Sequence, residues 1–529
     1  MPTRRPARVT EDLTDSHIRA AELCAALSLA TDLGSGQPLE HALRTAVLAV
    51  RLGERCGVSP ADLTDVYYVA LLHASGCTSD GHEAQHLYGD DIEPRAAFAL
   101  LDTADVDEIV AFLRGYVGAD RPPAERTALV EYALRNGLPL ARQALAMHCE
   151  VAQRFASWLG LSVGTTAALE HSFERWDGHG FPGVTAGDAL PLPARLLHVA
   201  RDISIFLNNG GVEAARVVLA TRAGTAYDPW IAGVALDRLD TLLGDLDETR
   251  IWEQAIDAEP KPGIWFAGDE IDAAFGALAT FADLKSPWFR THSLGVAEIA
   301  EAAAWRLDLP APAVARLRRA ALVHDLGRVG VSNAIWEKAG PLTFGERERV
   351  RLHPHFTERA FAQSQTLAEV GALGGAHHER LDGSGYHRGR RAADLDLGAR
   401  VLAAADHYCS LREARPYRPA FTSRDAAARL HDEVTARRLD AEAVSAVLAA
   451  AGHPRERHAR DLPAGLTARE LQVLRALVVG MTNEEIAARL RISPKTVGHH
   501  VQHIYQKAGV RSRAAATVWA FEHALISPA

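Results

Sequence analysis

The sequence contains few cysteines, few aromatic residues and no long apolar run. Its five cysteines are scattered over 529 residues without CxxC spacing, which argues against a disulfide scaffold or a zinc ribbon and suits a reducing cytosol. No stretch approaches the roughly 18 consecutive apolar residues of a membrane span. The segment after the basic residues 1–8 is amphipathic rather than continuously apolar, so we expect no signal peptide. These absences predict a cytoplasmic protein without a membrane partner.

The low aromatic content (6%) and the scarcity of strand-forming residues, beside abundant Ala and Leu, favour helices. A formal net charge of -10 argues against nucleic-acid binding over the whole chain, although one basic patch remains compatible with it. At 529 residues the chain is long enough for about three or four domains.

Seven imidazole and carboxylate side chains lie between residues 292 and 406. They are His292, His324, Asp325, His353, His377, His378 and Asp406. Adjacent residues on a helix diverge by about 100°, so His324 and Asp325 can reach two different metal ions. An aspartate can bridge two cations about 3.5–4 Å apart, and such a pair lowers the pKa of bound water and neutralises a phosphoryl group. This ligand set predicts a hydrolytic site for two divalent ions such as Fe, Mn or Zn.

The order of these residues resembles the HD superfamily of metal-dependent phosphohydrolases, and in particular its HD-GYP branch. The motifs are His292-Ser293, His324-Asp325-Leu326-Gly327-Arg328, His353-Pro354, His377-His378-Glu379-Arg380-Leu381-Asp382-Gly383-Ser384-Gly385-Tyr386 and Ala405-Asp406. The resemblance covers residues 285–450 and implies hydrolysis of cyclic di-GMP or a related phosphodiester. It implies that all seven residues are metal ligands, that Asp325 bridges and is catalytic together with Arg328, and that substrate contacts come from Arg328, Gly385, Tyr386 and Tyr417.

Three positions depart from the family pattern. Trp288 stands where some members have a glutamate for a third metal, so we expect two metals at most. Arg328 replaces a lysine, and a guanidinium stabilises phosphate charge but is a poor proton donor. His387 replaces the proline of the Gly-Tyr-Pro motif, which puts in doubt the contacts that this loop makes in the family.

An internal repeat relates the N-terminal half to this segment. His41 lies 32 residues before His73, as His292 lies 32 before His324. The run from Glu174 to Pro182 likewise matches that from Glu379 to His387. The sequence therefore predicts a duplicated helical domain.

The first copy has lost most of the candidate ligands. Ala74, Ser172, Phe173 and Arg201 stand at the positions of Asp325, His377, His378 and Asp406. The first copy also carries an insertion at about residues 78–126. Its remaining histidines, His41, His73 and His148, could in principle hold one zinc ion. Arg201, however, places a cation where a carboxylate belongs, which favours a structural or regulatory copy without metal.

The C-terminal residues predict a helix-turn-helix. Thr467 and Glu470 form a capping-box pattern, and Pro494 suits the first turn of a later helix. The strings Leu466 to Glu470, Ser493 to Val497 and Gly509 to Arg513 resemble the LuxR/NarL-type four-helix DNA-binding domain. Residues 462–529 contain eight Lys/Arg and four Asp/Glu, a local charge of +4.

The resemblance implies binding to DNA in the major groove, usually as a dimer, so we expect a homodimer. The expected DNA-contacting residues are Lys495, Thr496, His499, His500, Gln502, His503, Lys507 and Arg511. We expect Asn483 to cap the second helix of this domain. Trp519, Phe521 and Leu525 could form an apolar dimer face or simply the core of the domain.

We predict an all-α chain with tandem HD-type helical domains followed by a four-helix LuxR-type helix-turn-helix domain. The predicted parts are residues 1–252 (degenerate HD-type domain), 253–285 (connector helix region), 286–452 (HD-GYP-like metal phosphohydrolase domain), 453–463 (linker) and 464–529 (DNA-binding domain). The helix pattern at 269–284 fits either a stiff connector or the first helix of the second copy.

These parts together predict a transcription regulator that hydrolyses a cyclic dinucleotide with two divalent metal ions and binds promoter DNA. Two alternatives remain. One is a ligand-sensing regulator with negligible catalysis, which the departures at Arg328 and His387 favour. The other is an HD hydrolase of another nucleotide or phosphoester, for which DNA binding serves only as targeting.

Overall fold

The computed structural model describes residues 17–452, 463–523 and 525–526. The basic segment 1–8 and nearly all of the predicted linker 453–463 lie outside the described residues. The prediction of an all-α fold is confirmed, because the described regular structure is helical apart from two strands of two residues each. Among the described helices, none combines the length and hydropathy that crossing a bilayer requires.

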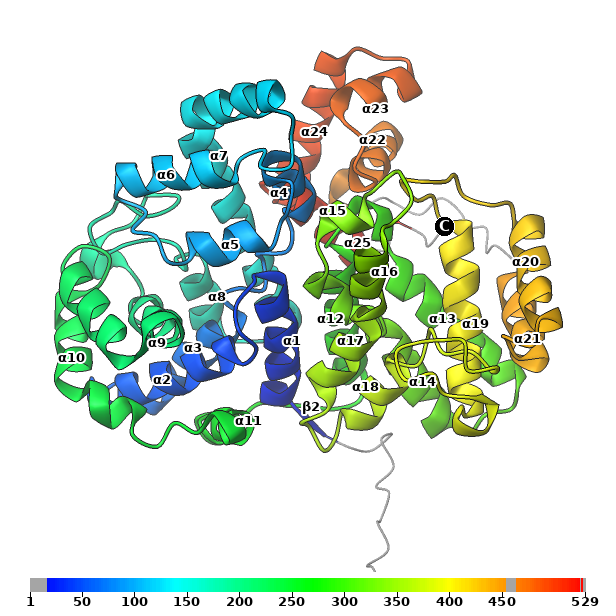
Figure 1. Cartoon of the computed structure of the whole chain (residues 1–529), viewed down its shortest axis with the longest axis horizontal. Helices are drawn as coiled ribbons and strands as arrows, with labels where there is room; N and C mark the ends of the chain where they lie inside the picture. Colours follow the sequence, from blue (N-terminus) through cyan, green and yellow to red (C-terminus); the bar gives the residue numbers. More distant parts are fainter. Residues whose placement is uncertain (1–16, 453–462, 524, 527–529) are drawn as a thin grey trace, which may run out of the picture.

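The first HD-type copy and its insertion occupy one side of the molecule (Figure 1). Its elements are β1 (Ile18–Arg19), α1 (Ala20–Gly34), α2 (His41–Arg55), α3 (Pro60–Leu72), α4 (Gly81–Tyr88), α5 (Glu93–Phe98), α6 (Val106–Tyr116), α7 (Pro123–Trp158), α8 (Val163–Leu169), η1 (Gly187–Ala189), α9 (Leu192–Arg222), α10 (Pro229–Leu243), η2 (Glu248–Arg250) and α11 (Ile251–Asp257). Helices α4 to α6 belong to the insertion, which has a small apolar cluster of its own around Phe112 and Leu113.

The second copy lies beside the first (Figure 1). Its elements are β2 (Trp265–Phe266), α12 (Asp269–Asp283), η3 (Pro287–Phe289), α13 (His292–Arg306), α14 (Ala311–Val323), η4 (Leu326–Gly330), α15 (Asn333–Trp336), α16 (Phe344–Arg351), α17 (His353–Phe361), α18 (Ala368–Gly374), η5 (Ala392–Asp394), α19 (Leu397–Arg412), α20 (Ser423–Thr435) and α21 (Ala441–Ala451).

The two copies repeat the same local structure at matching positions. Helices α2 and α13 both begin at a histidine and follow a residue in left-handed conformation, Glu40 (φ 71°) or Thr291 (φ 48°). Helices α3 and α14 both end just before a histidine whose Nδ1 donates to the carbonyl three residues earlier, at 2.8 Å for His73 and 2.6 Å for His324. The duplication inferred from spacing is thus present in the backbone.

Helix α12, in the predicted connector region, occupies the same place in the second copy that α1 occupies in the first. It packs against α13 and α14 as α1 packs against α2 and α3. Near its end, Asp283 accepts a hydrogen bond from the Ser293 amide (3.0 Å), just as Asp32 accepts one from the Ala42 amide (3.3 Å). The short strands β1 and β2, which precede α1 and α12, pair antiparallel, so equivalent segments of the two copies meet.

The copies pack against each other within one chain and share one hydrophobic core. Helix α1 contacts α17 and η4 of the second copy. The insertion adds a buried polar link, because the Asp91 carboxylate accepts hydrogen bonds from the Lys285 ammonium group and from the Asn333 amide. Both side chains of the Asp91–Lys285 pair are fully buried. The shared hydrophobic core and the buried Asp91–Lys285 ion pair therefore hold the two copies in one arrangement.

The C-terminal domain has its own core and comprises η6 (Pro463–Gly465), α22 (Ala468–Val478), α23 (Asn483–Leu490), α24 (Pro494–Ala508) and α25 (Arg513–Glu522). The capping box at Thr467 is confirmed. The expectation that Asn483 caps the second helix is wrong, because Thr482 is the cap and forms a second capping box with Glu485. Trp519 and Leu525 lie in the core of this domain.

This C-terminal domain docks on the first copy at the top of Figure 1. Helix α25 packs against α7. The Arg511 amide donates to Glu150 Oε1 (3.1 Å), and the Ser512 hydroxyl donates to Glu150 Oε2 (3.2 Å). Arg154 on α7 pairs with Glu522 on α25 at 3.5 Å. The surface of α7 thus joins the C-terminal domain to the degenerate copy.

Candidate metal centre

All seven predicted ligands come together in the second copy, and each lies at a fixed place on a helix end or a packed helix. His292 and His353 are the first residues of α13 and α17, and His324 and Asp325 directly follow α14. Asp406 projects from α19. His377 and His378 follow α18 in a short turn. Six of the seven are almost completely buried, and His378 is partly exposed.

The ligand atoms form two groups that could each hold a metal ion. One group is His353, His377 and His378, and the other is His292, His324, Asp325 and Asp406. Within each group the ligand atoms lie within 4.8 Å of one another. Imidazole nitrogen with carboxylate oxygen suits Fe, Mn or Zn.

Asp325 lies between the two groups. Its Oδ1 is 3.3 Å from His353 Nε2 and 3.5 Å from His377 Nε2. Its Oδ2 is 3.2 Å from His292 Nε2 and 2.9 Å from His324 Nε2. Neither oxygen accepts a hydrogen bond of ordinary geometry, although both are buried. A buried carboxylate needs a compensating partner. The Arg328 guanidinium lies 2.6 Å from Oδ2, whereas Oδ1 faces the His353 and His377 imidazoles, an environment that fits a bound metal ion.

The histidine tautomers also fit metal ions. His324, His353 and His377 each donate an Nδ1–H to a backbone carbonyl at 2.6–2.7 Å. Their Nε2 atoms therefore carry lone pairs that face the site. The Nε2 atoms of His353 and His377 are 3.0 Å apart, a close approach of two acceptors that a shared cation would stabilise.

At His377, His378, Asp325 and Asp406 the protonation states favour ligation as well. Burial lowers the pKa of His377 and of His378 well below the usual value, so both imidazoles are neutral. Burial alone would raise the pKa of Asp325 and Asp406, but nearby cationic and hydrogen-bonding groups outweigh it and hold both pKa values well below the usual value. Neutral imidazoles and ionised carboxylates are the forms that bind metals.

Glu413 is a residue at this site that the sequence motifs did not reveal. Its Oε1 is 3.0 Å from His292 Nδ1, and its Oε2 accepts a hydrogen bond from Arg415 at 2.7 Å. Burial opposes protonation of His292, but Glu413, together with Asp325 and Asp406, raises its pKa well above the usual value. Carboxylates behind a metal-binding histidine orient the ring. Glu413 lies just past α19, and no spacing rule within the motifs points to it.

Arg328 reaches into the same site. One of its terminal nitrogens is 2.6 Å from Asp325 Oδ2 and 3.5 Å from His292 Nε2. Its guanidinium lies over the Phe289 ring, 4.5 Å from the centroid, and near Trp336. The Nε and Nη1 atoms have no hydrogen-bond partner, so this cation has donors available for an anionic group.

The backbone packing of the loop after His378 requires a glycine at position 385. A Cβ atom on Gly385 would lie about 2.5 Å from the Arg380 nitrogen and the His378 oxygen. The Tyr386 ring lies 4.7 Å from that of His378. His387 pairs with Glu358 at 3.0 Å. Tyr417 is 60% exposed and near Arg418, so Tyr386, rather than Tyr417, is the tyrosine placed against the candidate ligands.

The first copy holds its three histidines differently. His148 faces Asp80 of the insertion at 3.1 Å, and although burial opposes it, Asp80 raises the pKa of His148 to about 10. Burial and Arg201 lower the pKa of His73 to about 4. Among the described residues, no group of candidate metal ligands includes His41, His73 or His148. Ala74 and Arg201 stand where the second copy has Asp325 and Asp406, and His148 is paired with Asp80, so this site is unsuitable for a metal ion.

The expected DNA-contacting residues lie on α24 and in the turn that follows it. Seven of them are exposed and His500 is half-buried. Lys507 donates to Glu470 at 2.7 Å, and the Arg511 backbone contacts Glu150. Lys495, His499 and Gln502 are therefore the exposed side chains whose contact with DNA would compete least with contacts inside the protein.

Comparison with known proteins supports both parts. Residues 277–443 match the HD domain model, and residues 464–520 match the model of bacterial regulatory proteins of the luxR family. A 3'3'-cGAMP-specific phosphodiesterase of Vibrio cholerae is 29% identical over 76% of this chain and 88% of its own length. A cyclic di-GMP phosphodiesterase of Pseudomonas aeruginosa is 34% identical over 31% of this chain and 41% of its own length.

The fold has a counterpart among solved structures. A crystal structure of a cyclic GMP-AMP specific phosphodiesterase from V. cholerae superposes with a TM-score of 0.59 and 25% identity. It covers 84% of this chain and all of the other. The chain therefore combines an HD domain, similar to curated cyclic dinucleotide phosphodiesterases, with a C-terminal domain that matches the luxR family of bacterial regulatory proteins.

Proposed function

We propose that this protein is a transcription regulator whose HD domain hydrolyses a cyclic dinucleotide with two divalent metal ions. The observation that carries the proposal is the position of Asp325, with one oxygen facing each of two groups of candidate ligands. The relatives act on 3'3'-cGAMP or cyclic di-GMP by name. Both compounds are cyclic dinucleotides, and this is the substrate class that we propose here.

The residues of the chain have separate roles in this proposal. His353, His377 and His378 would hold one metal, and the group around His292 the other. Bound metals would supply Lewis-acid activation of the phosphoryl group and a low pKa for water. Arg328 would bind a phosphate oxygen through its unpartnered nitrogens. Tyr386, whose ring lies tilted beside that of His378, would contact the substrate.

The second half of the proposal is DNA binding by α24. Lys495, Thr496, His499 and Gln502 are exposed along one helix, as a recognition helix requires. We propose that the protein acts as a homodimer, because paired half-sites are the usual target of such domains.

The test is turnover by the full chain after loading with Mn²⁺ or Fe²⁺. Cyclic di-GMP and 3'3'-cGAMP are supplied separately, and products are followed by chromatography, with Asp325→Ala as the control. A linear dinucleotide product from wild type alone is the expected result. Absence of product from both substrates in metal-loaded wild type would refute hydrolysis of this class.

A receptor without turnover is the second candidate function. The 2.6 Å ion pair between Arg328 and Asp325 favours it, because the guanidinium competes with a metal for the same oxygen. In that case cyclic dinucleotide binds but is recovered unchanged, and Asp325→Ala alters the DNA response. If neither binding nor turnover occurs, another nucleotide or phosphoester is the substrate.

A further inference from the structure

The degenerate copy contains a cavity of about 250 Å³ at the place where the second copy holds its candidate metal centre. Repeat positions form part of its wall: His41, His73, Ala74, Phe173 and Arg201. Residues of the insertion form another part of the wall. The cavity therefore lies between the repeated helices and the insertion, and the second copy has no corresponding insertion. Pockets for drug-sized ligands span roughly 300–1,000 Å³, so this cavity suits a smaller molecule.

One wall of the cavity carries an excess of positive charge. Arg201 and Arg222 share a single carboxylate, since Asp202 Oδ1 accepts from Arg201 Nε and Asp202 Oδ2 accepts from Arg222, both at 3.0 Å. Asp202 Oδ2 also accepts a hydrogen bond from the Tyr227 hydroxyl. On this wall two guanidinium groups share one carboxylate, and the backbone carbonyls of Ser172 and Leu100 accept further hydrogen bonds from Arg201 and Arg222.

The other charged groups around the cavity already have partners. Arg175 pairs with Asp102 and Asp177. Glu174 accepts hydrogen bonds from three backbone amides of the loop at 183–185. The positive feature that an anionic ligand meets is therefore the pair Arg201 and Arg222, which share the Asp202 carboxylate.

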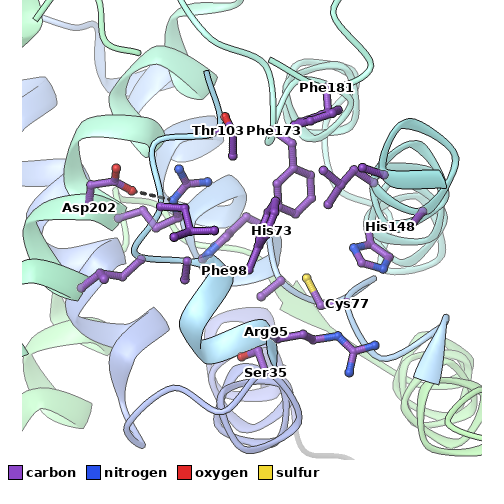
Figure 2. A pocket seen from close by; sticks show the side chains of 18 of the residues that line it. Ser35, His73, Cys77, Arg95, Phe98, Thr103, His148, Phe173, Phe181 and Asp202 are labelled. Atoms are coloured by element: carbon purple, nitrogen blue, oxygen red, sulfur yellow. Dashed lines mark hydrogen bonds and ion pairs between the residues drawn. The ribbon is translucent and has the colours of Figure 1, made fainter. Parts of the chain in front are cut away.

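Aromatic side chains line another part of the cavity. Phe98 and Phe112 from the insertion lie edge to face with centroids 5.7 Å apart, and both line the cavity. Figure 2 shows Phe173 beside His73, with Asp202 and His148 on opposite sides of the cavity. Phe173 stands at the position of the ligand His378, so the copy has exchanged a metal-binding side chain for an apolar one. His41 and His73 are neutral because burial lowers both pKa values.

We propose that this cavity binds a small organic monoanion, with its carboxylate against Arg201 and its apolar body against Phe98, Phe112 and Phe173. Metal ligands have been replaced by a cation and a phenyl ring, and the insertion supplies the remaining aromatic wall. Together these changes convert a hydrolytic site into a binding site for an amphipathic acid. The first copy would then bind its own ligand, and this binding would not depend on metal binding or hydrolysis in the second copy.

The test uses octanoate as the probe and octylamine as its cationic counterpart, titrated calorimetrically into the full chain. Wild type is expected to bind one octanoate per chain and octylamine at least about tenfold more weakly. Arg201→Met should weaken octanoate binding by about tenfold or more, which is the usual effect of losing one charge-assisted hydrogen bond. Asp202 keeps Arg222 as a partner in this variant, so we expect the protein to fold.

Two further variants complete the design. Ala99→Phe adds a ring at a residue that lines the cavity and should abolish binding of octanoate. Arg216→Met changes a partly exposed arginine on the same helix, α9, that pairs with Asp240. This variant should bind octanoate as wild type does. The proposal is overturned if octanoate fails to bind, if octylamine binds equally well, or if Arg201→Met binds octanoate as tightly as Arg216→Met does.

Discussion

At the scale of single residues, the candidate metal centre depends on which hydrogen-bond or ionic partners its buried nitrogen and oxygen atoms have. The motif residues could be predicted from the sequence because their types and order carry the ligand chemistry. Glu413 could not, since only the packing of the loop after α19 brings it within 3.0 Å of His292. Gly385 has a steric explanation in the structure, and its predicted contact with substrate stays a prediction.

Glu413→Gln tests whether the carboxylate behind His292 supports metal binding. Loss of the negative charge should weaken Mn²⁺ or Zn²⁺ affinity by about 10–100-fold, the usual effect of removing such a partner. Competition with a chromophoric chelator measures the affinity. Glu301→Gln on α13, which pairs with Arg318 at the surface, is the matched control. Equal affinities of the two variants would show that Glu413 does not support the site.

Arg328→Met tests the cation at the site. Removal of a donor to developing charge should lower kcat by about 10²–10³-fold, while metal content does not fall, because arginine is not among the ligands. Arg328→Lys should keep most of the turnover, since an ammonium group retains the charge. Arg316→Met, at a partly exposed surface pair with Glu369, controls for a general loss of arginine. A metal-loaded Arg328→Met protein with unchanged kcat would contradict this role.

At the scale of elements, capping patterns predict where a helix begins, but they do not decide between two adjacent residues that both suit the N-cap. Thr482 and Asn483 both suit an N-cap, and the choice falls on Thr482 because Glu485 completes a capping box with it. The helix at 269–284 could be predicted from its periodicity, but its assignment to the second copy rests on packing against α13 and α14. The hydrophobic periodicity of a segment predicts a helix, but it does not show which other helices that helix packs against.

Helix α24 allows a matched test of DNA contact. Lys495 is exposed and has no competing carboxylate among the contacts described above, whereas Lys507 is paired with Glu470. Lys495→Ala should weaken binding to duplex DNA at every sequence and reduce the slope of log affinity against log salt by about one. Fluorescence anisotropy at several salt concentrations measures both quantities. A slope that changes more in Lys507→Ala than in Lys495→Ala would contradict the proposed orientation of α24.

At the scale of the whole molecule, the tandem copies form one body. The sequence revealed the repeat but not the relation between its copies, because strands β1 and β2 are too short for any pattern. The contact of α25 with α7 could not be predicted either, since Glu150 and Arg154 resemble any pair of surface charges. The Asp91–Lys285 pair ties the insertion to the second copy.

Lys285→Met tests this link. Removal of one partner of a fully buried ion pair costs about 3–5 kcal/mol. Because Arg95 remains 3.3 Å from Asp91 Oδ2 as a second cation, the free energy of unfolding in urea should fall by at most that amount. Combining Lys285→Met with Asp91→Leu should cost less than the sum of the two single variants, because the partners are coupled. Additive losses would show that the pair makes no specific link.

The central claim is that Asp325 joins two metal ions in the second copy. The most direct measurement is the number of Mn ions per chain after reconstitution and removal of free metal, by elemental analysis of wild type and Asp325→Asn. We expect two ions per chain in wild type and at most one in the variant. No bound metal in wild type, or the same number of ions in Asp325→Asn, would contradict it.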